Sequence, residues 1–316
     1  MSHVVAVGET PLRIEPVGRT RFEMADEATL VASGIESDVA IAARRMGADA
    51  TWYSKLPATP TGRRISREVR QFGVDADPVT VADGTVGTVV AETGAHPRSD
   101  VTVTDRADAA AATLEPGELP MDDIQAADVV FCAGSTMALS ETAAETVSAV
   151  LRATSGSTTA FDLAFEPTLT TPEQARETVT RTFESVDVLT ARAADVRRVL
   201  DEDGQPQQLA HALAAAHDFE TVVVRRADGE AVVWQDDVIH DRSPVETETV
   251  DAAGDHAAFV GAFLERLADG DSPDEALAWA VAAGAVARTV PGPLFSVTRD
   301  EVAAVREELG DDATGY

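Results

Sequence analysis

A glycine and two titratable side chains stand together just before a predicted helix over residues 257–267. They are Gly254, Asp255 and His256. A carboxylate, or an imidazole with an unperturbed pKa of about 6.5, is the type of group that can act as a general base. Two simpler interpretations stay open. A histidine beside an aspartate is often solvated or paired, and Asp255 lies on a tight turn that can point it away from a substrate.

Several other kinds of chemistry are excluded by what the sequence lacks. Lys55 is the only lysine, and no Gly-x-x-x-x-Gly frame precedes it, so there is no Walker-type phosphate loop. Cys132 is the only cysteine, which excludes disulfide frameworks and cysteine-rich zinc sites. The histidines form no HExxH motif or other close ligand pair, so we expect no resident metal site of that kind.

Short apolar runs alternate with helical patterns, and these elements must position the candidate residues. Strands are predicted over 4–7, 50–54, 128–131, 158–161, 186–190 and 221–225, with a hairpin at 230–234 and 237–240. Helices are predicted over 37–46, 63–72, 140–152, 172–183, 193–200, 207–216, 257–267, 273–288 and 299–309. The strand–helix alternation from about residue 128 onward predicts a parallel sheet with helices on both faces.

Two segments near the N-terminus, 11–31 and 85–104, do not fit this alternation. Residues 85–92 and 100–104 alternate like exposed antiparallel strands. We therefore expect one domain over residues 1–316 that carries a small β lid. The unpaired edges of such a lid predict a homodimer or higher oligomer formed through it.

The charge of the chain is strongly negative and is distributed over its whole length. There are 25 Lys and Arg against 55 Asp and Glu, a net charge of −30. Nucleic acid and anionic membrane surfaces are therefore poor partners. The excess predicts a protein adapted to a salt-rich cytoplasm, with an ordinary acidic protein as the alternative. No signal peptide or long apolar segment is visible, so we expect a cytoplasmic protein.

Several short segments follow one another in a characteristic order. They are Gly8-Glu9-Thr10, Ser33-Gly34-Ile35-Glu36-Ser37-Asp38, Ser54-Lys55-Leu56-Pro57, Asp105-Arg106-Ala107-Asp108, Phe161-Asp162-Leu163 and Asp251-Ala252-Ala253-Gly254. In this order they resemble the ribokinase-like, or pfkB-type, carbohydrate kinases over nearly the whole chain, and most closely 2-keto-3-deoxygluconate kinases of haloarchaeal type. The resemblance implies a Rossmann-type α/β/α sandwich with a β lid, and ATP- and Mg²⁺-dependent phosphorylation of a sugar or sugar acid.

The resemblance also assigns roles to individual residues. The catalytic turn would comprise Asp251, Gly254, Asp255 and His256. Sugar contacts would fall on Gly34, Asp38, Arg106 and Asp162, and nucleotide contacts on Asp195, Arg226 and Gly229. The neighbouring pair of Arg225 and Arg226 either contacts nucleotide phosphate or, as the sequence favours, lies on the surface.

The chain departs from the family pattern at the positions that carry the chemistry. The family signature reads Asp-Thr-x-Gly-Ala-Gly-Asp-x-Phe, and its glycine turn opens a helix whose free N–H groups face the transferred phosphoryl group. Its last Asp, which takes the proton, corresponds to Ala257, and Asp255-His256 replace Ala-Gly. The arginine that clamps the substrate carboxylate in sugar-acid kinases corresponds to Glu166.

Two functions of different classes follow from this mixture. The first is a sugar or sugar-acid kinase with a rearranged and weakened site. The second is a catalytically silent paralogue that binds a sugar or a nucleotide and regulates a partner. This function is considered because the base, the glycine of the phosphoryl-binding turn and the carboxylate-binding arginine of the family are all replaced. Whether the protein is an enzyme is open at this stage, with the kinase favoured. A dehydrogenase is disfavoured, because no Gly-x-Gly-x-x-Gly follows a strand.

Overall fold

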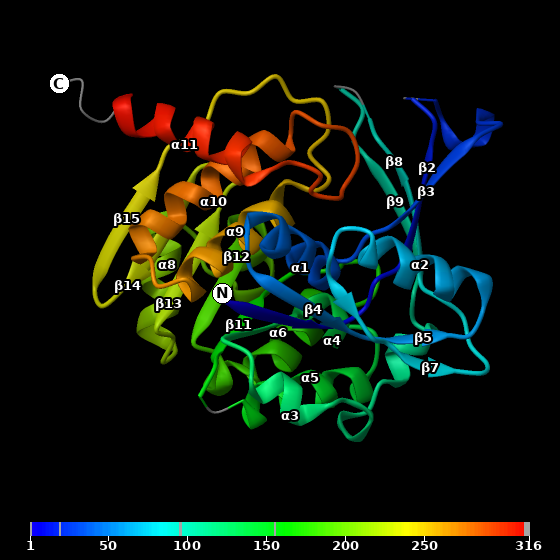
Figure 1. Ribbon diagram of the computed structural model, residues 1–316. Helices are drawn as coiled ribbons and strands as arrows, with labels where there is room; N and C mark the ends of the chain where they lie inside the picture. Colours follow the sequence, from blue (N-terminus) through cyan, green and yellow to red (C-terminus); the bar gives the residue numbers. More distant parts are fainter. Residues whose placement is uncertain (1, 19, 95–96, 155, 313–316) are drawn as a thin grey trace.

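Nine strands form one sheet through the middle of the molecule (Figure 1). The computed structural model describes all residues except 1, 19, 95–96, 155 and 313–316. In spatial order the strands are β15 (Val238–Arg242), β14 (Ala231–Gln235), β13 (Thr221–Arg225), β12 (Val188–Arg192), β11 (Thr158–Asp162), β10 (Val129–Ala133), β1 (His3–Val7), β4 (Asp49–Tyr53) and β6 (Asp75–Ala76). The strands from β13 to β6 are parallel, and β14 and β15 add an antiparallel hairpin. The predicted parallel sheet is confirmed.

Helices cover both faces of this sheet and close two hydrophobic cores. One core is built with α1 (Ile35–Met46), α2 (Pro60–Arg70), α9 (Asp255–Ala268), α10 (Pro273–Ala287) and α11 (Arg299–Asp312). The other is built with α3 (Met121–Gln125), α5 (Glu141–Ala153), α6 (Pro172–Thr180) and α8 (Pro206–Ala216). This is the α/β/α sandwich expected from the sequence. No helix in the described ranges is long and apolar enough to cross a membrane.

Shorter segments join these elements. They are the short α4 (Gly134–Met137) and α7 (Ala193–Asp195), a π-helical turn over Val196–Leu200, and 3-10 turns at Phe22–Met24, Ala110–Thr113, Pro116–Glu118 and Phe183–Ser185. The single helix predicted over 193–200 is therefore divided into α7 and the π-helical turn. The predicted cap of α5 is present, since the Ser140 hydroxyl accepts from the Ala143 N–H at 3.0 Å.

A separate four-stranded sheet, here called the lid sheet, stands at the side of the sandwich (Figure 1). Its order is β3 (Ala28–Ala32), β2 (Leu12–Pro16), β8 (Thr88–Glu92) and β9 (Val101–Asp105). A further pair, β5 (Lys55–Pro57) and β7 (Val79–Val81), lies below α2. The lid sheet comes from the two segments that broke the alternation of the sequence, 11–31 and 85–104.

Candidate functional site

A cavity of about 270 Å³ lies where the carboxyl ends of the central strands meet the lid sheet. Its polar lining comes from separate elements. These side chains are Arg13 of β2, Ser33 before α1, Asp38 of α1, Thr102 of β9, Arg106 after β9, Ser135 of α4, Glu166 after β11 and Arg192 at the end of β12. Open α/β sheets bind ligands at this edge because loops and helix N-termini converge there. The cavity is therefore the first candidate for a small-molecule site.

The start of α1 brings two predicted sugar-binding residues to the cavity wall. Gly34 precedes the helix, and a Cβ at this position would lie 2.3 Å from the Glu9 carbonyl oxygen, so only glycine fits. Asp38 accepts hydrogen bonds from the Ser33 hydroxyl at 2.6 Å and from the Ser37 hydroxyl at 3.3 Å. Burial raises the pKa of Asp38 to about 7. Its carboxyl group is thus placed to exchange hydrogen bonds with a hydroxylated ligand.

Arg106 links the cavity to a buried carboxylate behind it. Its guanidinium donates to Glu9 Oε2, with Nε and Nη2 at 2.7 and 2.6 Å, and its Nη1 lies 3.6 Å from Glu166 Oε2. Burial raises the pKa of Glu9, against the opposing effect of the Arg106 charge. The predicted substrate contact Arg106 therefore reaches the cavity, although two carboxylates of the chain already share its charge.

A second buried carboxyl group, Glu36, lies beneath the same wall. Its Oε1 accepts from the Thr136 hydroxyl at 2.6 Å, and its Oε2 has no partner among the described residues. Burial raises the pKa of Glu36 from 4.5 to about 8. Because the folded state holds this proton more tightly than the unfolded state, the contribution of Glu36 to stability is full below pH 4.5 and is lost as the pH rises through 8.

The Glu36→Gln variant is therefore expected to lose less stability than the wild type between about pH 5 and pH 8.5. The glutamine side chain stays neutral throughout. The free energy of unfolding of the variant, relative to that of the wild type, should therefore rise by more than about 1 kcal/mol between the ordinary pKa of a glutamate and about pH 8.5. Urea unfolding at several pH values measures the difference. The exposed Glu23→Gln serves as control and should follow the wild-type profile. Parallel curves for wild type and Glu36→Gln would show that Glu36 is ionised in the fold.

The turn before α9 presents alanines to the cavity in place of titratable groups. Asp251 holds the turn, because its side chain accepts from the N–H groups of Ala253 at 2.9 Å and Gly292 at 3.0 Å. Gly254 caps α9, where a Cβ would lie 2.1 Å from the Pro293 carbonyl oxygen. Ala253 and Ala257 line the cavity. The position of the family base therefore faces the cavity, and its methyl group cannot accept a proton.

Asp162 and His256 form a buried pair beside the cavity and do not line it. His256 Nε2 lies 2.8 Å from Asp162 Oδ2, which also accepts from the Thr190 hydroxyl at 2.7 Å. Both side chains are 1% exposed. Burial lowers the pKa of His256. Burial alone would raise the pKa of Asp162, but the neighbouring His256 and the hydrogen bonds from His256 and Thr190 lower it. Of the interpretations of His256, the structure matches the paired one, through its buried hydrogen bond with Asp162.

The residues predicted on the nucleotide side lie outside the cavity lining. Arg226 pairs with Asp228 at 3.1 Å and Glu230 at 3.3 Å, in a turn where Gly229 has a φ of +108°. Burial raises the pKa of Asp195 to about 6, and its Oδ2 has no partner among the described residues. No group of three His, Cys, Asp or Glu side chains is placed for a metal ion in the described part of the chain.

A phosphate group does not fit the start of α9 as this chain builds it. The Asp255 carboxylate lies between Arg288 Nε at 2.7 Å and Arg225 Nη2 at 3.1 Å. Burial alone would raise the pKa of Asp255, but the charges and hydrogen bonds of the two arginines lower it. The surface position favoured for Arg225 is wrong, since the side chain is 4% exposed and bound to Asp255. Only its neighbour Arg226 lies at the surface.

Sequence reasoning did not single out Arg13 or Ser135 as site residues, and it considered Arg192 only as the first residue of the motif segment in which Asp195 has the nucleotide role. Arg13 alternates with buried Leu12 on β2, but the alternation does not tell which face of the lid sheet covers the cavity. Ser135 lies two residues after the end of β10, in α4, and Arg192 ends β12. Their position at the ends of parallel strands was the available signal.

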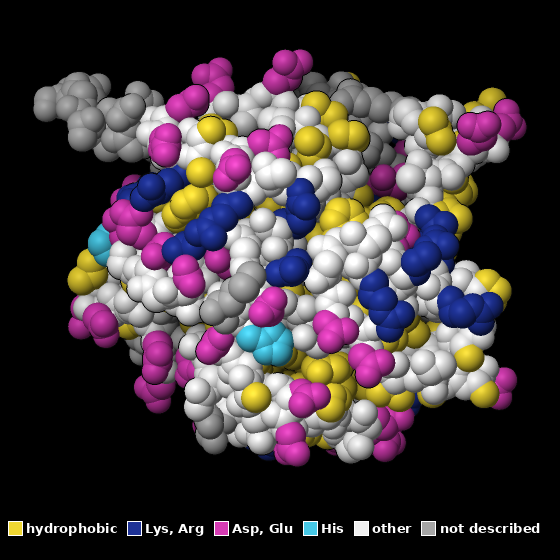
Figure 2. Space-filling model, in the orientation of Figure 1, with side chains coloured by type: hydrophobic (Ala, Val, Ile, Leu, Met, Phe, Trp, Pro, Cys, Tyr) yellow, Lys and Arg dark blue, Asp and Glu magenta, His cyan; other side chains and the backbone are white. Residues whose placement is uncertain are grey.

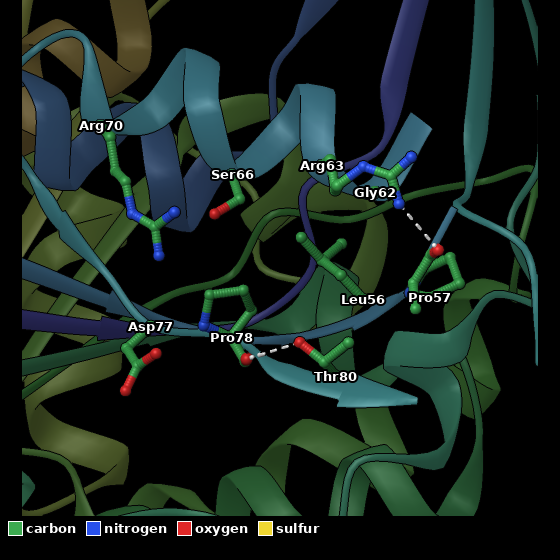
Figure 3. Close-up of a pocket in the computed structure, with 10 residues that line it drawn as sticks. Leu56, Pro57, Gly62, Arg63, Ser66, Arg70, Asp77, Pro78 and Thr80 are labelled. Atoms are coloured by element: carbon green, nitrogen blue, oxygen red, sulfur yellow. Dashed lines mark hydrogen bonds between the residues drawn. The ribbon is translucent and has the colours of Figure 1, made fainter. Parts of the chain in front are cut away.

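A second cavity, of about 360 Å³, lies between α2 and the β5–β7 pair (Figure 3). Ser66 and Arg70 extend from α2 toward Asp77 and Pro78. Arg63 and Arg70 donate to the carbonyl oxygens of Ala58 and Ala76. Leu56 and Pro57 of the motif segment Ser54-Lys55-Leu56-Pro57 line this cavity, but no residue with an assigned site role does, so the cavity is separate from the candidate site.

Comparison with known proteins identifies the family of the chain. The family model described as pfkB family carbohydrate kinase matches residues 1–299. A 2-dehydro-3-deoxygalactonokinase of Haloferax volcanii is 42% identical over 306 residues, which are 96% of each chain.

Solved structures agree with the family match. The 2-dehydro-3-deoxygluconokinase of Thermotoga maritima is 25% identical with a TM-score of 0.91, over 97% of this chain and 100% of that one. A candidate ribokinase II of Escherichia coli, solved with ATP and Mg²⁺, shares the fold at 18% identity and a TM-score of 0.85, over 98% and 100% of the two chains. The chain therefore belongs to the pfkB family of carbohydrate kinases.

Proposed function

We propose that this carbohydrate kinase takes a 2-keto-3-deoxy sugar acid into the cavity under the lid sheet and phosphorylates it far more slowly than its relatives do. The observation that carries the proposal is the composition of the cavity wall. Arg13, Arg106 and Arg192 line the cavity and outnumber its two acidic side chains, Asp38 and Glu166, which favours a small anion as ligand. Ala257 occupies the position of the base on the same wall.

The substrate class rests on charge and on the relatives. Two similar proteins act on 2-dehydro-3-deoxy sugar acids by name, and each is matched over nearly its whole length. A sugar acid carries a carboxylate, which an arginine binds through two hydrogen bonds. The family also implies ATP and Mg²⁺ as co-substrate and cofactor, which stay a proposal for this chain.

Arg192 is the residue best placed to bind that carboxylate. The clamp position of the family is Glu166, which faces Arg106 at 3.6 Å and would repel an anion. Arg13 is paired with Glu15 at 2.6 Å. Among the described residues no acidic side chain lies within ion-pair distance of Arg192, although its charge acts to lower the pKa of the buried carboxyl groups of Asp195 and Asp162. No close ion pair therefore competes with a ligand for its guanidinium. We expect Arg192 to replace the missing clamp from the neighbouring strand.

Calorimetric binding of 2-keto-3-deoxygluconate and 2-keto-3-deoxygalactonate tests this assignment. Wild type should bind at least one of them, and Arg192→Ala should weaken that binding about 10- to 100-fold by removing a charge-assisted contact. Arg197→Ala is the matched control, because Arg197 donates to the Gly204 carbonyl and does not line the cavity. Equal binding of a neutral hexose, or equal losses in both variants, would contradict the proposed substrate class.

The slow transfer follows from the residues at the start of α9. Ala257 cannot accept the proton of the attacking hydroxyl, and a missing general base costs about 10²- to 10⁴-fold in rate. Asp255 and His256 are both engaged in internal pairs. The same observations favour the second candidate function, a catalytically silent protein that binds the sugar acid and regulates a partner. Binding without any turnover would select it.

The lid sheet suggests a dimer. Its outer face carries a row of aliphatic side chains in register, Leu30, Ile14, Val90 and Val103, while Arg13 and Val89 face the cavity. Leu30 is 40% and Val103 60% exposed. Exposed aliphatic faces of this kind mark protein interfaces. We propose a homodimer through this face.

Light scattering in about 2 M KCl should give the mass of a dimer for wild type. Val103→Asp is expected to give a monomer, because a charge in the centre of the apolar row cannot be buried without a partner. Val238→Asp, at a similarly exposed position on β15, should remain dimeric. A monomeric wild type, or a dimer that survives Val103→Asp, would remove the lid sheet as the interface.

Three further expectations remain proposals supported by sequence and family. The whole chain forms one domain of which the lid sheet is a part. The protein works in the cytoplasm, as is usual for carbohydrate kinases. Its acidic surface suits a salt-rich cell interior, with neither nucleic acid nor membrane as partner.

A further inference from the structure

Three side chains form a buried ion cluster at the N-terminus of α9. Asp255 Oδ2 accepts a hydrogen bond from Arg288 Nε at 2.7 Å and another from Arg225 Nη2 at 3.1 Å. Asp255, Arg288 and Arg225 are 8%, 9% and 4% exposed. One carboxylate oxygen therefore accepts hydrogen bonds from two guanidinium groups at a site shielded from bulk water.

The surrounding elements make room for this convergence. Arg225 ends β13 and lies over the Phe259 ring, 5.2 Å from its centroid. A Cβ at Gly284 would lie 3.1 Å from Arg225 Nη2, so the glycine provides the space for the guanidinium. Arg288 also donates to the carbonyl oxygens of Asp228 and Ala227, which ties the cluster to the turn after β13.

The chemistry of this place is that of an anion site. Two arginines meet at one carboxylate oxygen of Asp255, the first residue of the 14-residue helix α9, whose N-terminus adds partial positive charge to the same region. The Arg225 Nε is buried and has no hydrogen-bond partner among the described residues, so the single carboxylate leaves a donor unused. A tetrahedral oxyanion with several acceptor oxygens would satisfy more of these donors than Asp255 does.

We propose that Asp255 is an internal anion that fills a phosphate site formed by Arg225, Arg288 and the start of α9. The site then holds the chain's own carboxylate in place of a phosphate group, while the sugar cavity stays open. This deepens the proposed function and rests on it, because it attributes slow transfer to an occupied phosphate site as well as to the missing base at position 257.

The test uses Asp255→Ala and inorganic phosphate, with chloride at equal ionic strength as reference. Asp228→Ala is the matched control, because it removes one negative charge from the adjacent turn and leaves the cluster intact. Thermal melts and calorimetry should show weak, unsaturated phosphate binding for wild type and Asp228→Ala. Asp255→Ala should bind phosphate at least about tenfold more tightly. A folded Asp255→Ala without this gain, or an equal gain in Asp228→Ala, would overturn the proposal.

Asp255→Ala leaves two buried arginines unpaired and can unfold in chloride. Refolding by phosphate but not by chloride would then support the site. If the variant stays unfolded in both salts, Asp255→Asn is used, because it keeps the side-chain volume without the charge. It should then bind phosphate at least about tenfold more tightly than the wild type, and a folded Asp255→Asn without this gain would overturn the proposal. Sugar-acid binding by the wild type is measured separately, so its failure would contradict the proposed function and leave the phosphate site unaffected.

Discussion

Replacing Ala257 with aspartate should raise sugar-acid-dependent turnover about 10²- to 10⁴-fold. Ala257 lies in the first turn of α9 and faces the cavity. A carboxylate there can accept the proton of a bound hydroxyl as it attacks. The side chain is 7% exposed beside an open cavity, so the larger residue has space to enter.

The measurement is ADP release with each 2-keto-3-deoxy sugar acid, ATP and Mg²⁺ at high KCl. Ala253→Asp is the matched control, because it adds the same charge to the same wall at a position that is not that of the base. It should give no gain. Combining Ala257→Asp with Asp255→Ala should exceed Ala257→Asp alone, since phosphate could then enter. Slower turnover by Ala257→Asp than by wild type would mean that another group already serves as base.

The structure also limits how the family turn can be rebuilt. Replacing His256 with glycine would remove the buried partner of Asp162, whose carboxylate would then keep only hydrogen bonds from Thr190 and the Ala164 N–H. Breaking a buried pair on one side typically costs about 3–5 kcal/mol. Ala257→Asp leaves both this pair and the cluster of Asp255 with Arg225 and Arg288 in place. The single substitution at 257 therefore separates a catalytic effect from a loss of stability better than rebuilding the whole turn does.

The melting temperature should rise by about 10 °C or more between about 0.1 and 3 M KCl. The net charge is −30, and acidic side chains are spread over the whole visible face of the molecule (Figure 2). At about 0.1 M salt these charges repel over roughly 10 Å, whereas at about 1 M the screening length falls to about 3 Å. Differential scanning calorimetry measures the change.

Sucrose provides the control for this salt effect. An uncharged osmolyte favours the compact state without screening charge. At matched osmolality it should therefore give a smaller rise than KCl. A melting temperature that is flat in KCl, or one that rises equally in sucrose, would exclude charge screening as the cause.

The sequence predicted the regular elements well because their signals are local. The strand over Thr221–Arg225 has the predicted ends, and α5 begins after the predicted cap Ser140. The short strands β5 and β7 were not predicted, since three-residue strands depend on their partner more than on their own pattern. The helix predicted over 193–200 became α7 and a π-helical turn, a local bond pattern that periodicity does not resolve.

The candidate site was predictable where residues sit at strand ends or helix starts. Gly34, Asp38 and Arg106 meet in one cavity, as the motif order implied. The pairing of Arg225 with Asp255, 30 residues apart, was not predictable, because a dipeptide of two arginines is normally solvated. Arg192 was missed as an anion-binding residue because its importance depends on Glu166, which only the fold brings to the same wall.

Steady-state turnover of the wild-type protein tests the central claim most directly. The assay contains ATP, Mg²⁺ and either 2-keto-3-deoxygluconate or 2-keto-3-deoxygalactonate in multimolar KCl. It uses samples whose sugar-acid binding has already been established by calorimetry. We predict binding of at least one sugar acid with a rate at least about 100-fold below the ordinary kinase range of about 1–100 s⁻¹. Turnover within that ordinary range by the unmodified protein would contradict the account of Ala257 and Asp255.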